Sequence, residues 1–286
     1  MAEQISYVEA VLQTPLLQRA VGAGALVGLA CACLSPFVVL RRMAFVGDGM
    51  AHAAFGGLGL GLFLISGSKS DDAAVQGITI GFCLVLALAV GRVSRRGQGR
   101  ISEDSAIGIA FSVAMALGAL LITLRLRSEP QYANWEGYLF GNLTTIGQGQ
   151  VWLTLALAST VVVLLAVLHK EWMFYTYDEN LAEVSGLPVS LLHYLFLLLL
   201  VLTVVVAARI VGIVLASASL VLPGLASLAV CRSLGSALAL AGVLGVVSYE
   251  VGLFCSYIWN VPPGSCVILA QFFFFVLATA ARRLRA

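Results

Sequence analysis

Charged residues are scarce in this sequence. They make up 10% of its 286 residues, whereas 60% belong to the hydrophobic set. In a soluble domain about a quarter of the residues are charged. This composition therefore excludes an ordinary soluble globular protein. The small net charge of +2 gives no basis for nucleic-acid binding. The sequence therefore predicts a protein that is embedded in membrane lipid.

Lysine is scarcer still, which restricts the possible chemistry. The two lysines, Lys69 and Lys170, follow Ser68 and His169, so the chain has no G-x-x-x-x-G-K-[ST] phosphate loop. It also has no H-E-x-x-H zinc motif and no G-x-S-x-G nucleophile elbow. We therefore predict that the chain is not an enzyme and does not hydrolyse ATP by itself.

The cysteines are few and show no C-x-x-C pairing. Cysteines in apolar segments are usually small packing residues, and this is our interpretation here. A soft-metal site at Cys31 and Cys33 is the alternative. The full set is Cys31, Cys33, Cys83, Cys231, Cys255 and Cys266.

What the sequence has in abundance is uncharged apolar stretches of about 20 residues, the length that a helix needs to cross a bilayer. None alternates with period 2, which favours helices over a membrane β-barrel. The predicted fold is all-α: one polytopic transmembrane domain over residues 1–286. It has about nine spans, and eight is the alternative count. The stretches are 20–40, 49–66, 73–91, 105–124, 149–168, 190–208, 210–231, 233–257 and 264–281.

The basic residues predict the orientation. Lys and Arg are enriched in cytoplasmic loops, and strict alternation of the spans places most of them on one side. That side also holds the carboxyl terminus, which is therefore predicted to be cytoplasmic. The amino terminus lacks the layout of a cleaved signal peptide and would lie outside with nine spans, or inside with eight. The clusters on the inner side include Arg41, Arg42, Arg95, Arg96, Lys170, Arg232, Arg282, Arg283 and Arg285.

Asp48 and His52 are candidate metal ligands. An ionisable side chain within a span costs at least a few kcal/mol unless it is paired or hydrated. A spacing of four puts both on one helical face, and carboxylate oxygen with imidazole nitrogen suits zinc, manganese or ferrous iron. Alternatively, Asp48 caps the helix and His52 bonds a backbone carbonyl. The nearby glycines would either let an ion approach the helix or allow close packing of neighbouring helices. These glycines are Gly47, Gly49, Gly56 and Gly57.

Two further positions in the spans have alternative interpretations. Glu250 lies near the middle of the eighth predicted span and either lines a pathway or pairs with a neighbouring helix. Pro223 removes a helix hydrogen bond and predicts a kink in the seventh span. The carbonyl freed by this kink would face a cavity, or the kink would serve helix packing alone. His169 and His193 are expected at the membrane interface.

The longest inward segment, HKEWMFYTYDENLAEVSGLPVS (169–190), predicts a short helix over about 178–186. Asp178 is a suitable N-cap and Glu179 suits the first turn. Gly186 followed by Pro188 is typical of a helix end. Such a helix would bind a cytoplasmic partner, or it would rest on the membrane surface.

The string LRRMAFVGDGMAHAAFGGLGLGL (40–62) resembles the second-helix signature of the permeases of bacterial zinc and manganese ABC importers. Further matching strings follow in the family's order, and together they extend from about residue 16 to residue 281. They are GRISEDSAIGIAFSVAMALG (99–118), YLFGNLTTI (138–146), DENLAEVSGLPV (178–189), RIVGIVLASASLVLPGLASLA (209–229) and GLFCSYIWNVPPGSCVIL (252–269).

This resemblance implies a permease that imports zinc or manganese, with iron as a further candidate, across the bacterial inner membrane. It implies a homodimer, a separate cytoplasmic ATP-binding subunit that hydrolyses ATP, an extracytoplasmic metal-binding protein, and no permanently bound cofactor. Asp48 and His52 match the family's metal-coordinating pair. The short inward helix matches its coupling helix, with candidate contacts at Asp178, Glu179, Leu181, Ala182, Glu183 and Gly186.

One residue departs from the family pattern, because Asn260 stands where an acidic residue is expected before the V-P-P-G turn. This departure weakens any interpretation of that loop as an acidic metal entrance. The main rival function is a proton-coupled secondary metal or cation transporter with Asp48, His52 and Glu250 as a relay. A regulatory or scaffold subunit is a third alternative.

Overall fold

The computed structural model describes residues 13–65, 72–96, 103–128 and 147–285, and all regular structure in these ranges is helical. The four helices of the amino-terminal half, α2 to α5, are followed by α7 and two short helices, α8 and α9. The helices are α2 (Pro15–Leu40), α3 (Ala44–Leu64), α4 (Asp72–Arg96), α5 (Glu103–Ser128), α7 (Gln148–Val167), α8 (His169–Tyr177), α9 (Glu179–Val184), α10 (Val189–Val211), α11 (Ile213–Ser219), α12 (Leu222–Val230), α13 (Leu234–Trp259) and α14 (Pro263–Arg285).

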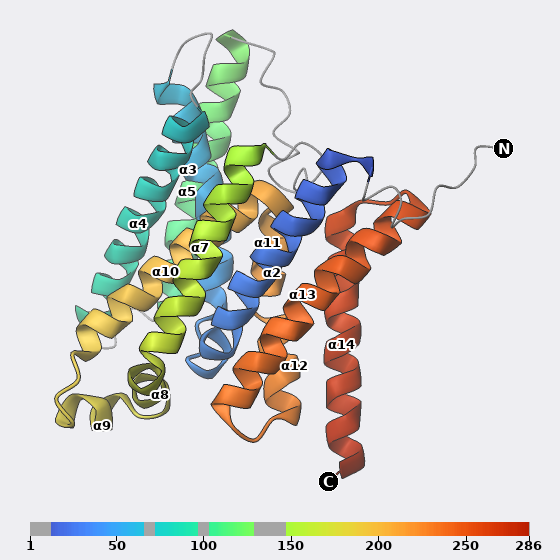
Figure 1. The fold of residues 1–286 in the computed structure, drawn as a ribbon. Coiled ribbons are helices and arrows are strands. Elements are labelled where there is room, and N and C mark those ends of the chain that lie inside the picture. Colours follow the sequence, from blue (N-terminus) through green and yellow to red (C-terminus); the bar gives the residue numbers. More distant parts are fainter. Residues whose placement is uncertain (1–12, 66–71, 97–102, 129–146, 286) are drawn as a thin grey trace.

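Successive long helices run in opposite directions. The ends of α2, α4 and α14, the short helices α8 and α9, and the turn between α12 and α13 gather at one end of the bundle (Figure 1). These are the segments that carry the basic clusters. The alternation assumed by the charge-based orientation is therefore present, and the positive-inside rule assigns this end to the cytoplasm.

Eight of the nine predicted spans correspond to described stretches that are long and apolar enough to cross a membrane. The helix α3 is not among them, because Asp48, His52 and six glycines lower its mean hydropathy. Its 21 residues nevertheless extend about 31 Å at 1.5 Å per residue, the thickness of a bilayer core. The fold is an all-α polytopic membrane bundle.

The seventh predicted span is broken into two helices rather than kinked. Gly212 has a φ of 88°, which ends α10, and α11 then covers seven residues before α12 begins at Leu222. Pro223 lies in the first turn of α12, where a missing N–H costs nothing. The proline therefore starts a new helix.

Buried polar contacts hold this broken region. The N–H of Gly224 donates to Ser35 Oγ on α2 at 2.8 Å, which satisfies a backbone donor at the start of α12. Ser219, at the end of α11, contacts the Tyr249 hydroxyl at 3.1 Å and accepts a hydrogen bond from Gln271 Nε2 at 2.9 Å. All these side chains are buried, so the break is fixed by α2, α13 and α14.

The glycines of α3 serve close helix packing. A Cβ on Gly57 would lie 2.9 Å from the Cα of Thr79 on α4, and Gly56 is packed equally closely against α5. Small residues allow such approach between membrane helices. Gly47 and Gly49 face Leu220 and Ile107, as the packing interpretation expects.

Candidate metal site and coupling face

Asp48 and His52 lie on an open stripe in the first half of α3. Most of this helix is buried, but the side chain of Asp48 is 51% exposed and that of His52 is 23% exposed. Phe45, one turn earlier on the same stripe, is also exposed. A half-exposed carboxylate at this place cannot face lipid without a large energetic cost. The stripe therefore requires water, a cation or another protein surface.

The geometry of the pair selects one histidine tautomer. His52 Nδ1 lies 3.0 Å from the backbone carbonyl oxygen of Asp48 and 3.7 Å from its carboxylate Oδ1. A carbonyl oxygen can only accept a hydrogen bond, so a neutral His52 carries its proton on Nδ1. Its Nε2 then presents a lone pair, which is the arrangement of a metal-binding histidine oriented by its second nitrogen. The backbone bond proposed as the alternative is present, and it is compatible with metal binding.

The pair lies next to α5, because the His52 ring packs edge-on against Phe111 at 4.6 Å between centroids. The described residues contain no group of three or more His, Cys, Asp or Glu side chains that could hold a metal ion. Within the described residues, Asp48 and His52 are thus two candidate ligands without a third such side chain beside them, whereas zinc takes four ligands and manganese about six.

The cysteines are not part of a described metal cluster. All six are free, and Cys31 and Cys83 are fully buried among apolar side chains. Cys31 and Cys33 have no third soft donor beside them in the described part of the chain. Packing is the role that their surroundings favour.

Glu250 and Pro223 lie away from the Asp48–His52 pair. Glu250 is half-buried on α13, and within the described chain it makes no hydrogen bond or ion pair. The main packing partners of α13 are α2, α14 and α12, whereas α3 packs mainly on α5 and α4. The structure thus does not bring Glu250 together with Asp48 and His52.

The short inward helix forms where the sequence predicts it. Asp178 Oδ1 accepts a hydrogen bond from the Leu181 N–H at 2.9 Å, so Asp178 is the N-cap of α9. At the other end Gly186 has a φ of 82°, and the Leu187 N–H bonds the Ala182 carbonyl. This pair of features is a Schellman motif, which ends the helix.

The predicted coupling residues divide into an outer and an inner set. Leu181 and Val184 are 51% and 86% exposed, and Glu183 and Gly186 are also exposed. Ala182 is fully buried and faces the bundle. An exposed apolar pair at the end that carries the basic clusters is a suitable contact for another protein.

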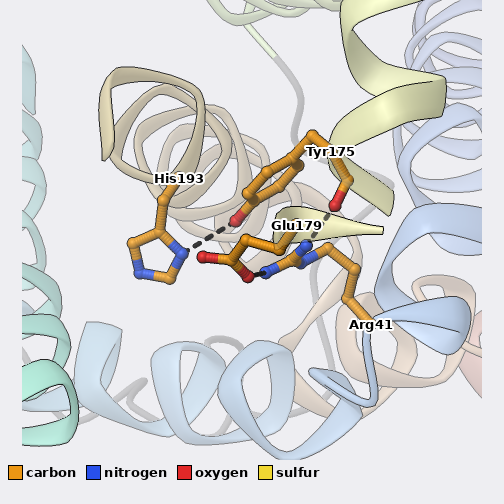
Figure 2. Close-up of polar contacts among 4 residues, drawn as sticks. All are labelled: Arg41, Tyr175, Glu179 and His193. Carbon is orange, nitrogen blue, oxygen red and sulfur yellow. Dashed lines mark hydrogen bonds and ion pairs between the residues drawn. The ribbon is translucent and has the colours of Figure 1, made fainter. Parts of the chain in front are cut away.

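Sequence reasoning missed the contacts that attach α9 to the bundle (Figure 2). Arg41, at the end of α2, makes an ion pair with Glu179 Oε2 at 2.8 Å and donates to the Tyr175 carbonyl. Its guanidinium also stacks on the Tyr175 ring at 3.6 Å, and the Tyr175 hydroxyl bonds His193 Nδ1 at 2.8 Å. The sequence signal was the basic pair Arg41–Arg42, which the charge count used for orientation alone.

His193 corrects an expectation. It lies in the second turn of α10, near a span end as expected, but it is 8% exposed and packed rather than interfacial. The aromatic side chains of α8 explain this burial, because Trp172 and Tyr175 are fully buried and stack on Phe196 and His193. His169, at the start of α8, is half-buried as an interfacial residue would be.

Asn260 has a structural explanation of its own. It ends α13 in the left-handed conformation, with φ 52° and ψ 46°. Asparagine tolerates this region far better than most residues. The string 138–146 of the resemblance lies outside the described residues, as does the start of the string 99–118.

A multi-pass bundle with a carboxylate–imidazole pair on one transmembrane helix and an exposed short helix at one end is an arrangement that suits a membrane transport subunit. Residues 13–282 match the model of the ABC 3 transport family. The chain belongs to this family and is a multi-pass, non-catalytic permease subunit of a bacterial ABC transport system.

Relatives from several bacteria support the assignment. The chain is 34% identical over 278 residues to the manganese transport system membrane protein MntC of Halalkalibacterium halodurans, which covers 97% of this chain and 91% of that protein. It is 34% identical to the chelated iron transport system membrane protein YfeD of Yersinia pestis, covering 92% and 84%. The solved structure of PsaBC from Streptococcus pneumoniae in complex with Fab matches with a TM-score of 0.84 and 27% identity, covering 98% of both chains.

Proposed function

We propose that this chain forms the membrane pathway of an ATP-driven importer of divalent transition metal ions, with manganese and iron as the first candidates and zinc as a third. The observation that carries the proposal is the exposed Asp48–His52 pair in a permease of this family. Relatives at 34% identity are named for manganese and for chelated iron. The metal is the transported substrate, and no resident cofactor is proposed.

The donor set supports a transition metal. Asp48 supplies a hard carboxylate oxygen and His52 supplies the borderline nitrogen Nε2. Manganese and ferrous iron accept both donors, and zinc accepts them as well. Alkali cations have no such preference for imidazole. Two protein ligands per chain also suit a transport site, which must release its ion.

A second copy of the chain would complete the site. The carboxylate of Asp48 is exposed on α3, and α5, which packs on α3, carries Ile109 and Val113 with more than 60% exposure. A homodimer packed across these exposed residues would remove Asp48 from lipid and bring two donor pairs toward one axis. Four ligands would then surround the ion, and water would supply any others.

Two further partners belong to the proposal, one on each side of the membrane. Because the chain has no phosphate loop, a separate cytoplasmic subunit must hydrolyse ATP. The exposed Leu181 and Val184 on α9 are its proposed docking contacts, which makes the segment 178–186 the coupling helix of a single permease domain. An extracytoplasmic protein would deliver the metal at the opposite end.

The test is radiometal uptake into vesicles that contain this chain, its ATP-binding subunit and its metal-binding protein. We expect uptake of manganese or iron that requires ATP, and replacing Asp48 and His52 together by alanine should lower it about tenfold or more. Phe45→Leu, on the same stripe but without a donor atom, is the matched control and should transport normally.

The opposite outcomes are equally clear. Uptake driven by a proton gradient without the ATP-binding subunit would contradict the proposal and favour the secondary transporter. Unchanged uptake by the Asp48→Ala, His52→Ala variant would show that the metal is held elsewhere. Transport of zinc in preference to manganese and iron would change the substrate but keep the mechanism.

A further inference from the structure

We propose that Arg41 is a positioning residue that transmits the movement of α9 to the helix that carries Asp48 and His52. This inference rests on the proposed function, because it assumes that an ATP-binding subunit moves α9. It concerns a side chain that contacts neither the metal pair nor the exposed face of α9. Figure 2 shows Arg41 between Glu179 and Tyr175.

The first step is the join between α2 and α3. Arg41 is the C-cap of α2, and a Schellman pair of backbone bonds closes the turn: Arg42 N–H to the Val39 carbonyl at 3.1 Å and Met43 N–H to the Val38 carbonyl at 2.8 Å. The helix α3 begins at the next residue, Ala44. A displacement of Arg41 is therefore passed to α3 through a short, hydrogen-bonded turn.

The second step is the set of contacts that the Arg41 guanidinium makes. Arg41 contacts Glu179, the first residue of α9, and Tyr175, in the last turn of α8, at the same time. The planar fork of arginine can donate in two directions while its face stacks on the ring at 3.6 Å. The side chain of Arg41 is 14% exposed and that of Glu179 is 42% exposed, so the ion pair is shielded from solvent mainly on the arginine side. The contact thus joins segments that are 138 residues apart in sequence.

The third step concerns α9 itself, most of whose residues are not buried against the bundle. It is six residues long, and apart from Ala182 its residues are partly or fully exposed. Along the chain α9 connects to α8 and to α10, and α10 also packs on α3, so the Arg41 contact is a second and more direct link from α9 to the start of α3. Within the described residues, the ion pair of Arg41 with Glu179 links α9 to the turn between α2 and α3. Arg41 therefore lies between the proposed docking helix and the helix that carries Asp48 and His52.

The experiment measures metal transported per ATP hydrolysed by the reconstituted complex. We expect Arg41→Gln and Glu179→Gln each to lower this ratio about tenfold, and we expect Arg41→Gln to leave binding of the ATP-binding subunit and its ATP hydrolysis within about twofold of the wild type. The double variant should lose no more than either single variant, because both remove one link. Arg42→Gln is the matched control, since Arg42 is exposed and makes no ion pair within the described chain.

Two further variants separate this role from a loss of folding. Arg41→Lys keeps the charge but not the fork and the stacking, so it should lower the ratio partially. The charge-swapped pair Arg41→Glu with Glu179→Arg should transport better than Arg41→Glu alone.

Three results would overturn the inference: a normal ratio in Arg41→Gln, additive losses in the double variant, or loss of binding to the ATP-binding subunit. The last would show that Arg41 only holds α9 in place for docking. A wild-type complex without ATP-driven uptake contradicts the proposed function itself, so the two failures are distinguishable.

Discussion

Gly56 on α3 and Ala114 on α5 lie so close together that a Cβ on the glycine would be 2.5 Å from the alanine carbonyl oxygen. No side chain fits at this distance without moving a backbone. The position of α3, and with it the Asp48–His52 stripe, is therefore set by direct backbone contact with α5.

The first prediction follows from this contact. Gly56→Ala should lower the free energy of unfolding by about 1–3 kcal/mol, because overpacking forces α3 away from α5. Gly108→Ala on α5 is the control: a Cβ there meets nothing within 4 Å, so the helix propensity of alanine should leave stability unchanged or raise it. Thermal unfolding in detergent micelles gives both values, and equal shifts in the two variants would contradict the packing argument.

The second prediction concerns the start of α9. Asp178→Ala removes the side-chain acceptor of the Leu181 N–H and should destabilise this short helix by about 1 kcal/mol, whereas Asp178→Asn keeps an acceptor and should cost less. Hydrogen exchange of the Leu181 amide measures the local effect. If exchange is as slow in Asp178→Ala as in the wild type, the cap does not stabilise α9.

The third prediction tests the bond between Tyr175 and His193. Tyr175→Phe keeps the ring beneath Arg41 but loses the 2.8 Å bond to His193 Nδ1, so it should cost about 0.5–1.5 kcal/mol of stability. Tyr177→Phe removes a hydroxyl from a side chain that is 62% exposed, and unfolding of this control should match the wild type. A neutral result for Tyr175→Phe would mean that the hydroxyl bond is not part of the packing of α8 on α10.

The fourth prediction separates the two transport mechanisms. Glu250→Gln should leave ATP-driven metal uptake unchanged, because α13 packs on α2, α12 and α14 rather than beside the metal pair. The isosteric change removes any proton-carrying role and keeps the shape. Uptake that falls to the level of the Asp48→Ala, His52→Ala variant would instead support a relay that includes Glu250.

The sequence predicted the parts of this fold that depend on local chemistry. Hydropathy located the spans, and the capping pattern of Asp178, Glu179 and Gly186 located α9 to within a residue or two. Both signals are local, since burial in lipid and helix capping are decided within a few residues. The candidate pair Asp48 and His52 came from spacing along one helix.

Contacts between distant segments could not be predicted in this way. The pairing of Arg41 with Glu179 spans 138 residues and leaves no local trace in the sequence. The burial of His193 depends on Tyr175 and Trp172 of another helix. The break between α11 and α12 was missed because residues 213–230 form one continuous apolar stretch, and hydropathy does not register a change of helix direction.

That break also bears on how the chain is made. The helices α11 and α12, with seven and nine residues, extend only about 10 and 14 Å, less than half of a bilayer core. The freed backbone groups between them find partners such as Ser35 on a helix synthesised much earlier. During biosynthesis this region therefore cannot reach its final shape when it leaves the ribosome. Its contacts with Tyr249 and Gln271 can form only after α13 and α14, which follow it in the chain, have been made.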